Sequence, residues 1–300
     1  MASFDVVGLG ENSVDLVYRV PCAPAADIKI PASSHEVSCG GQVATTLAAC
    51  ASLGLRTAYI GACGNDHNGA RIREALAAAT VDTSHCLVRD VANRHAVILV
   101  DERNGDRTVV WHRDPRLALA AADVPGAAVL DARLLHVDDL DEDASIAAAR
   151  MAANAGIPVT SDIDRVTPCT LELVTLSTAA IFSAHVPRAL TGEPDPERAL
   201  RKLRATQAGW LCMTLGAHGA MLLEGDRLHH VPACRVDAVD TTGAGDVFRA
   251  GFIHAWLEGR SPSETLRFAA AAAAVSCTRR GAMTSVPSLP DVHRLLGGEL

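Results

Sequence analysis

The sequence predicts an α/β fold: one doubly wound, mainly parallel sheet with helices on both faces, plus a small β-sheet lid that projects from it. Short apolar runs of strand length alternate with longer runs of helical period, as in parallel sheets that are covered on both faces. Two further stretches read as pairs of alternating strands. The 300 residues, 49% of them hydrophobic, can form a large core. We therefore expect residues 1–300 to form a single domain.

The main sheet is expected to contain six buried strands. The apolar runs that predict them are residues 4–10, 56–64, 134–138, 157–164, 179–185 and 210–216. Helical periodicity between these runs predicts helices at 42–54, 68–80, 141–156 and 195–209. Near the C-terminus, Ser261 as N-cap, Pro262 at the first helical position and Glu264 three residues after the cap mark the start of another helix.

The lid is predicted from two strand pairs, which lie within about 12–36 and 93–114. Residues 14–20 are expected to pair with 27–31, and residues 95–101 with 107–113 through the turn at 102–106. Arginines and histidines accompany the second pair, namely Arg94, His95, Arg107, His112 and Arg113. They are typical of a solvated sheet face, or they bind an acidic sugar if two of them converge on a pocket.

Composition excludes several classes of protein. The formal net charge of −8 provides no basic field for a polyanion, so we expect no nucleic-acid partner. The N-terminus has no basic region followed by a long apolar run, and apolar windows elsewhere are interrupted by charged residues, so no membrane partner is expected. Nine scattered cysteines without a CxxC pair are typical of reduced thiols, which favours a cytoplasmic location.

The stretch "DAVDTTGAGDVFRAG" (237–251) carries the most specific chemistry. Gly243, Ala244 and Gly245 have little side chain, so their amides can approach an oxyanion at the start of a helix. Asp246 is then either a favoured first-turn residue or a catalytic base. Phosphoryl transfer needs an oriented nucleophile, a base and fixed positive dipoles, and this turn offers the last two. The glycine-flanked turn in 214–226, followed by a hairpin, offers a surface for a nucleotide.

"DTTGAGDVFRAGF", together with "CGGQVATTLAACASLGLRTAYIGACGNDHNG" (39–69), resembles the two signatures of the ribokinase-like, or PfkB, carbohydrate kinases. The resemblance runs from 10–15 through 214–220 to 278–287, and its motifs occur in the expected order. It implies a ribokinase-like fold and an ATP-dependent sugar kinase. It also implies ATP, Mg²⁺ and a monovalent cation such as K⁺ as cofactors, and a homodimer formed through the lid.

The resemblance also assigns roles to individual residues. Asp246 matches the catalytic base, and Gly243, Ala244 and Gly245 match the anion hole. Residues implied or considered for the sugar are Asp15, Gly40, Gly41, Thr45, Arg107, Asp138 and Asp139. Those for the nucleotide are Ser183, Thr214, Gly216, Gly219 and Thr242, and those near a monovalent cation are Asp240 and Ser285.

The chain departs from the family pattern at two places. Thr45 stands where the family usually has Asn, and Ser183 and Val186 occupy the ends of an Asn-x-x-Glu motif that organises Mg²⁺. Either Asp162 or Asp164 replaces that motif, or the nucleotide itself holds most of the metal.

The pattern is most similar to the branch of ketohexokinase-like and sulfofructose-kinase-like proteins. Asp138 and Asp139 favour a neutral ketohexose such as fructose, since carboxylates bind polyols and repel anions. An acidic or sulfonated sugar would need arginine or lysine in the pocket. A nucleoside would need an aromatic surface, for which Trp111 and Tyr18 are available. The missing metal motif leaves a non-catalytic sugar-binding or regulatory protein as a further alternative.

Overall fold

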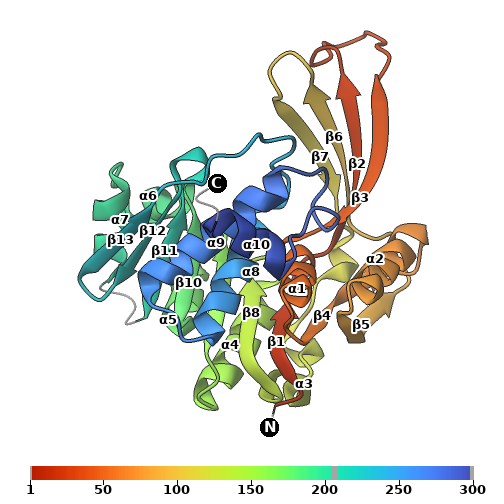
Figure 1. Ribbon diagram of the computed structural model, residues 1–300. Helices are drawn as coiled ribbons and strands as arrows, with labels where there is room; N and C mark the ends of the chain where they lie inside the picture. Colours follow the sequence, from red (N-terminus) through yellow and green to blue (C-terminus); the bar gives the residue numbers. More distant parts are fainter. Residues whose placement is uncertain (1, 205–208, 298–300) are drawn as a thin grey trace.

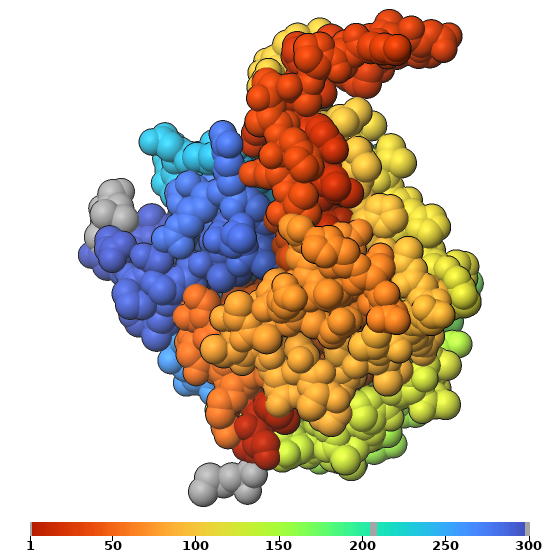
Figure 2. Space-filling model, turned by 90° about the vertical axis from the view of Figure 1, so that its right-hand side faces the viewer, coloured from red at the N-terminus to blue at the C-terminus, as the bar shows by residue number. Residues whose placement is uncertain are grey.

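The computed structural model describes residues 2–204 and 209–297, which form two sheets. The main sheet has the order β13-β12-β11-β10-β9-β8-β1-β4-β5, and the smaller one has the order β3-β2-β6-β7. Figure 1 shows the smaller sheet projecting from the body, and we call it the lid. Figure 2 shows the same projection from the side.

The main sheet is parallel from β5 to β11, and β12 runs antiparallel to both of its neighbours. Its strands are β1 (Phe4–Leu9), β4 (Thr57–Gly64), β5 (Asp82–Arg89), β8 (Ala132–Asp138), β9 (Val159–Ile163), β10 (Ala179–Ser183), β11 (Trp210–Thr214), β12 (Ala220–Glu224) and β13 (Arg227–Val231). The lid strands are β2 (Ser13–Val20), β3 (Ser34–Gly40), β6 (His95–Asp101) and β7 (Arg107–His112).

Helices cover both faces of the main sheet, as the alternation of apolar runs predicts (Figure 1). One face carries α1 (Gln42–Ser52), α2 (His67–Ala78), α8 (Ala244–Leu257), α9 (Pro262–Cys277) and α10 (Leu289–Gly297). The other carries α3 (Gly126–Leu130), α4 (Glu142–Asn154), α5 (Thr170–Leu176), α6 (His185–Thr191) and α7 (Pro196–Leu203). No helix in 2–204 or 209–297 is long and apolar enough to cross a bilayer.

The predicted start of α9 is confirmed. The Ser261 side chain accepts a hydrogen bond from the Glu264 amide, and the Glu264 carboxylate accepts one from the Ser261 amide at 3.0 Å. Two backbone donors that a helix leaves unused are thereby satisfied at its first turn.

Strand order creates a reversal point at the centre of the main sheet. From β1 the chain continues toward β4 on one side, and from β8 it continues toward β9 on the other. Parallel strands end at the same edge, so the residues after β1, β8, β9 and β10 gather there. Ligands of open α/β sheets bind at such a reversal, outside the carboxyl ends of the strands.

The structure differs from the predicted elements at one strand of the lid, at one edge strand of the main sheet and at one helix. Residues 27–31 are not a strand, and β2 pairs instead with β3. Pro31 ends this segment and Pro24 precedes it; neither has an amide for a strand ladder, and Asp27 has a φ of 58°. The edge strand β5 was not predicted, because its half-exposed residues do not alternate cleanly. The helix predicted over 195–209 is observed as α7, and 205–208 lie outside the described residues.

Candidate active site

The edge at the reversal point holds a cavity of about 590 Å³ between the main sheet, the start of α8 and the lid. Asp246 and Gly245 of α8 line it, as do Asp162 of β9 and Trp111 of the lid. A smaller adjoining hollow extends along the lid past Asp15. The two hollows share Asp246, so this residue can be reached from either one.

The first turn of α8 is built on Gly243. This residue has a φ of 74°, and a Cβ there would lie 2.9 Å from the Ala282 Cβ, so only glycine fits. Its carbonyl accepts the amide of Val247 at 2.9 Å, which starts the helix. The Ala244 amide donates to the Thr241 carbonyl at 3.2 Å. The amides of Gly245 and Asp246 are therefore the ones that the first turn leaves for an anion.

Asp246 lies in this first turn and is half-buried at the cavity wall. Burial raises the pKa of Asp246 well above its usual range, and the charge of Asp162 raises it further, while Arg249 opposes the rise. A carboxyl group with a raised pKa beside an anion-binding turn is suited to accept a proton from a hydroxyl. The second of the two interpretations of Asp246, a catalytic base, fits this position.

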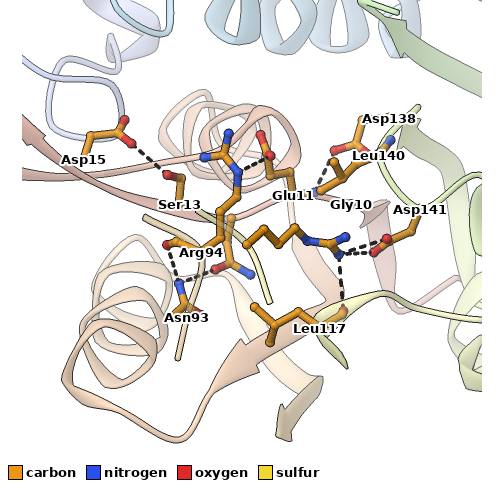
Figure 3. Close-up of polar contacts among 12 residues, drawn as sticks. Gly10, Glu11, Ser13, Asp15, Asn93, Arg94, Leu117, Asp138, Leu140 and Asp141 are labelled. Atoms are coloured by element: carbon orange, nitrogen blue, oxygen red, sulfur yellow. Dashed lines mark hydrogen bonds and ion pairs between the residues drawn. The ribbon is translucent and has the colours of Figure 1, made fainter. Parts of the chain in front are cut away.

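Glu11 and Arg94 form an ion pair across the base of the lid (Figure 3). The Arg94 Nε lies 2.6 Å from the Glu11 Oε1, and the side chains are 18% and 10% exposed. The Arg94 guanidinium also lies 5.6 Å from the centre of the Trp111 ring. Glu11 was not among the sequence candidates, although its place directly after a strand that ends in a G-x-G turn was a usable signal.

Asp15, Gly40 and Gly41, which the resemblance implies for sugar binding, lie next to one another. The Ser13 hydroxyl donates to Asp15 at 2.7 Å, and Gly40 lies against the other carboxylate oxygen of Asp15. Gly41 has a φ of 101°, and a Cβ there would lie 2.6 Å from the Glu11 carbonyl oxygen. The loops after β1 and β3 can therefore meet only through glycine.

Asp138 and Thr45 are fully buried, and neither is among the described residues that line the two hollows. The Asp138 carboxylate accepts the amides of Glu11 at 2.7 Å and Leu140 at 3.0 Å (Figure 3). It therefore holds the loops after β1 and β8 together, and does not face the place expected for a sugar. Thr45 lies beneath Gly243 on α1, where its methyl group would touch a side chain at that position.

Asp139 lines the cavity, but Arg165 pairs with it. The Arg165 Nε lies 3.2 Å from Asp139 Oδ1, and the amides of Asp164 and Arg165 donate to Oδ2. A similar ion pair joins the fully buried Asp162 to Arg249. Both carboxylates are charge-compensated.

Ser183 lines the cavity, whereas Val186 is fully buried in the core on the far side of the sheet. The family's metal-organising carboxylate therefore has no equivalent at this position. No group of three or more His, Cys, Asp or Glu side chains is arranged to hold a metal within the ranges 2–204 and 209–297.

The residues expected around the nucleotide lie along the same edge. Ser183 and Thr214 are opposite one another on β10 and β11. Gly216 and Gly219 shape the turn after β11, with φ values of 57° and 92°. Thr242 lines the cavity near the lid.

Asp240 links this edge to the C-terminal loop. Its Oδ1 accepts the hydroxyl of Thr242 at 2.8 Å, and its Oδ2 accepts the Gly281 amide at 3.0 Å. The Thr242 hydroxyl in turn accepts a hydrogen bond from the lid residue Arg107 at 3.0 Å. Ser285 is buried and donates to the Ala282 carbonyl at 2.9 Å. Asp240 and Ser285 therefore both contact the turn that contains Gly281 and Ala282, and so flank it.

Comparison with known proteins extends these observations. The family described as pfkB family carbohydrate kinase matches residues 3–289. A ribokinase of Arabidopsis thaliana is 29% identical over 97% of this chain and 80% of its own length. A fructokinase of Klebsiella pneumoniae is 29% identical over 86% of this chain and 91% of its own length. The structure of Arabidopsis thaliana ribokinase complexed with ribose and ATP superposes with a TM-score of 0.87, at 27% identity over 99% of both chains.

Proposed function

This chain belongs to the pfkB family of carbohydrate kinases, and from that premise we propose that it transfers the γ-phosphoryl group of ATP to a hydroxyl of a neutral ketohexose such as fructose. The observation that carries the proposal is the position of Asp246. It lies in the first turn of α8, beside the amides left for an anion, and faces the cavity that the lid borders.

In the proposed mechanism, the sugar lies along Asp15 and Gly41 with one hydroxyl directed at Asp246. Asp246 accepts the hydroxyl proton as the sugar oxygen bonds to the γ-phosphorus, and the bond from that phosphorus to the β–γ bridging oxygen breaks, releasing ADP. The amides of Gly245 and Asp246, in the turn that Gly243 starts, stabilise the charge on the transferred phosphoryl oxygens. Ser183, Thr214, Gly216, Gly219 and Thr242 are the proposed nucleotide contacts along the same edge.

Mg²⁺ is proposed to arrive with the nucleotide. Asp164 and Ser183 line the cavity and present the hard oxygen ligands that this ion prefers, and they would hold it together with phosphate oxygens. When bound, the ion supplies charge neutralisation at the phosphates.

The turn flanked by Asp240 and Ser285 is the proposed place of a monovalent cation such as K⁺. Turnover in K⁺ compared with tetramethylammonium tests that assignment.

A neutral sugar is favoured because guanidinium groups at the cavity already have partners. Those partners are Glu11 for Arg94, Asp139 for Arg165, Asp162 for Arg249 and the Thr242 hydroxyl for Arg107. Two of the lid arginines, Arg94 and Arg107, line the cavity, so an acidic or sulfonated sugar stays an alternative: Arg94 would have to give up Glu11, whereas Arg107 holds only a neutral hydroxyl. Trp111, 60% exposed and at the cavity wall, favours a nucleoside as the second candidate substrate, because its ring could stack on a base.

An ADP-release assay across neutral ketoses, aldoses, acidic sugars and nucleosides, with Mg²⁺ and K⁺ present, tests the proposal. We expect the highest kcat/KM with a neutral ketohexose. A preference for nucleosides that is lost in Trp111→Ala would support the second candidate. No turnover with any acceptor would support a sugar-binding or regulatory protein.

We also propose that residues 1–300 act as one domain and pair as a homodimer through the lid. Its edge strand β7 has no second neighbour among the described strands, and Val109, Val110 and Trp111 on it are 51%, 64% and 60% exposed. Light scattering should give twice the chain mass for the wild type and the mass of a single chain for Val110→Lys.

A cytoplasmic location is proposed because all nine cysteines are free thiols.

A further inference from the structure

Arg249 is a buried cation in an otherwise apolar stretch of α8. Its side chain is 3% exposed, and it pairs with the Asp162 carboxylate of β9, which is 1% exposed. Its Nε has no hydrogen-bond partner within the described structure. Burying such a pair is expensive, and apolar replacements of similar volume are often equally stable. The pair is therefore poorly explained by stability alone.

The guanidinium lies directly behind the anion-binding turn. Arg249 follows Asp246 by three residues, so the two side chains lie on the same face of the helix. A Cβ at Gly245 would come within 2.9 Å of the Arg249 Nη1, so the guanidinium packs against that glycine. Arg249, Asp162 and Asp246 all line the same cavity.

We propose that Arg249 is a positioning residue for phosphoryl transfer: its guanidinium, held behind the turn by its ion pair with Asp162, favours the carboxylate form of Asp246 that accepts the sugar's proton. The inference rests on the proposed function, since Asp246 matters as a base only if a hydroxyl is phosphorylated. It concerns a residue that acts through Asp246 without needing to touch the sugar.

Charged groups face the site around Asp246 from every neighbouring element. They are Glu11 after β1, Asp15 of β2, Arg94 before β6, Arg107 of β7, Asp139 after β8, Asp162 of β9, Asp164 and Arg165 after it, and Arg249 of α8. The fully buried Asp138 at the end of β8 does not line the site, but its charge also acts on Asp246. Most of these groups are acidic, and Arg94 and Arg165 are paired with carboxylates of their own.

These charges act on Asp246 in opposite directions. After burial, Asp162 contributes most to raising the pKa of Asp246, and Glu11 and Asp138 add to it. Arg249 lowers that pKa and so limits the rise. Removing Arg249 should therefore protonate the base at higher pH, whereas removing the charge of Asp162 should have the opposite effect.

The test is a ¹³C NMR titration of the full chain labelled at aspartate carboxyl carbons. The Asp246 signal is identified by its absence in Asp246→Asn. We expect Arg249→Met to raise the midpoint of this signal by at least about one pH unit and Asp162→Asn to lower it. Arg249→Lys keeps the charge and should stay within about 0.3 units of the wild type.

Opposite shifts in Arg249→Met and Asp162→Asn support the proposal, because a purely structural role would not produce them. An unchanged midpoint in Arg249→Met overturns it, as does an equal rise in Arg249→Lys. Thermal unfolding of each variant shows whether it is folded, and Arg249→Gln, which also removes the charge, takes the place of Arg249→Met if that variant does not fold. The titration needs no turnover, so absence of sugar phosphorylation by the wild type would refute the proposed function and leave this result standing.

Discussion

Replacing Asp246 with asparagine removes the proposed base with little change of shape. Asparagine has the size of aspartate and can remain in the first turn of α8, so the anion-binding amides keep their places. General-base catalysis contributes about 10²- to 10⁴-fold to rate. That range corresponds to about 2.7 to 5.5 kcal/mol of barrier. We expect turnover to fall by at least about 10²-fold.

Sugar affinity should change by only severalfold, because Asp15 and Gly41 lie on other elements and are untouched. Turnover is measured by ADP release, and affinity by calorimetry with the sugar alone. Asp237→Asn is the matched control, since it makes the same chemical change at an exposed position of the preceding loop. Unchanged turnover in Asp246→Asn, or an equal loss in the control, would refute the role of Asp246.

The same carboxyl group predicts a pH dependence of activity and stability. The pKa of Asp246 is raised in the folded chain, so the acid limb of kcat/KM should lie above the usual carboxyl range. Between the unfolded and folded pKa values the folded chain binds more protons, so this group makes stability fall as pH rises. Asp246→Asn should therefore unfold at a higher temperature than the wild type at pH 7 to 8, and not at pH 3. A lower Tm of the variant at pH 7 would contradict a raised pKa for Asp246.

Two further substitutions test the architecture of the site. Gly243→Ala should weaken ATP binding and destabilise the chain more than Gly259→Ala does. Both glycines have a φ near 74°, but only Gly243 lies against another residue. Calorimetry measures the ATP affinity of the two variants, and thermal unfolding measures their stability. Arg113→Met leaves the Asp141 carboxylate, 5% exposed, without its cation and should cost about 3 kcal/mol. Urea unfolding measures this cost against the exposed control Arg116→Met, and equal losses would count against a structural ion pair below the lid.

Much of the fold is predictable from local pattern. Strand-length apolar runs and helical periods predict the central strands and most helices, because each depends on residues near one another in the chain. The strand that pairs with β2 cannot be predicted from the local sequence pattern alone. Residues 27–31 and 34–40 both alternate weakly, and the prolines around the first segment decide between them.

The site, too, is predictable from the sequence only where its residues are close together in the chain. The turn at 243–246 is recognisable because its glycines and carboxylate are contiguous. The Glu11–Arg94 pair joins residues that are far apart in sequence, so no spacing rule reveals it. Asp138 was expected to face a sugar, but it is buried and binds loop amides instead. A carboxylate at a strand end can serve either purpose, and only the path of the neighbouring loops decides between them.

The most direct test of the central claim follows the phosphoryl group itself. The chain is incubated with fructose, Mg²⁺ and ATP carrying ³²P at the γ-position, and the labelled products are separated for the wild type and for Asp246→Asn. The account predicts label on the sugar, one ADP released for each sugar phosphate, and at least about 10²-fold less of both in the variant. Label found only in inorganic phosphate, or equal labelling of fructose by the two proteins, would contradict it.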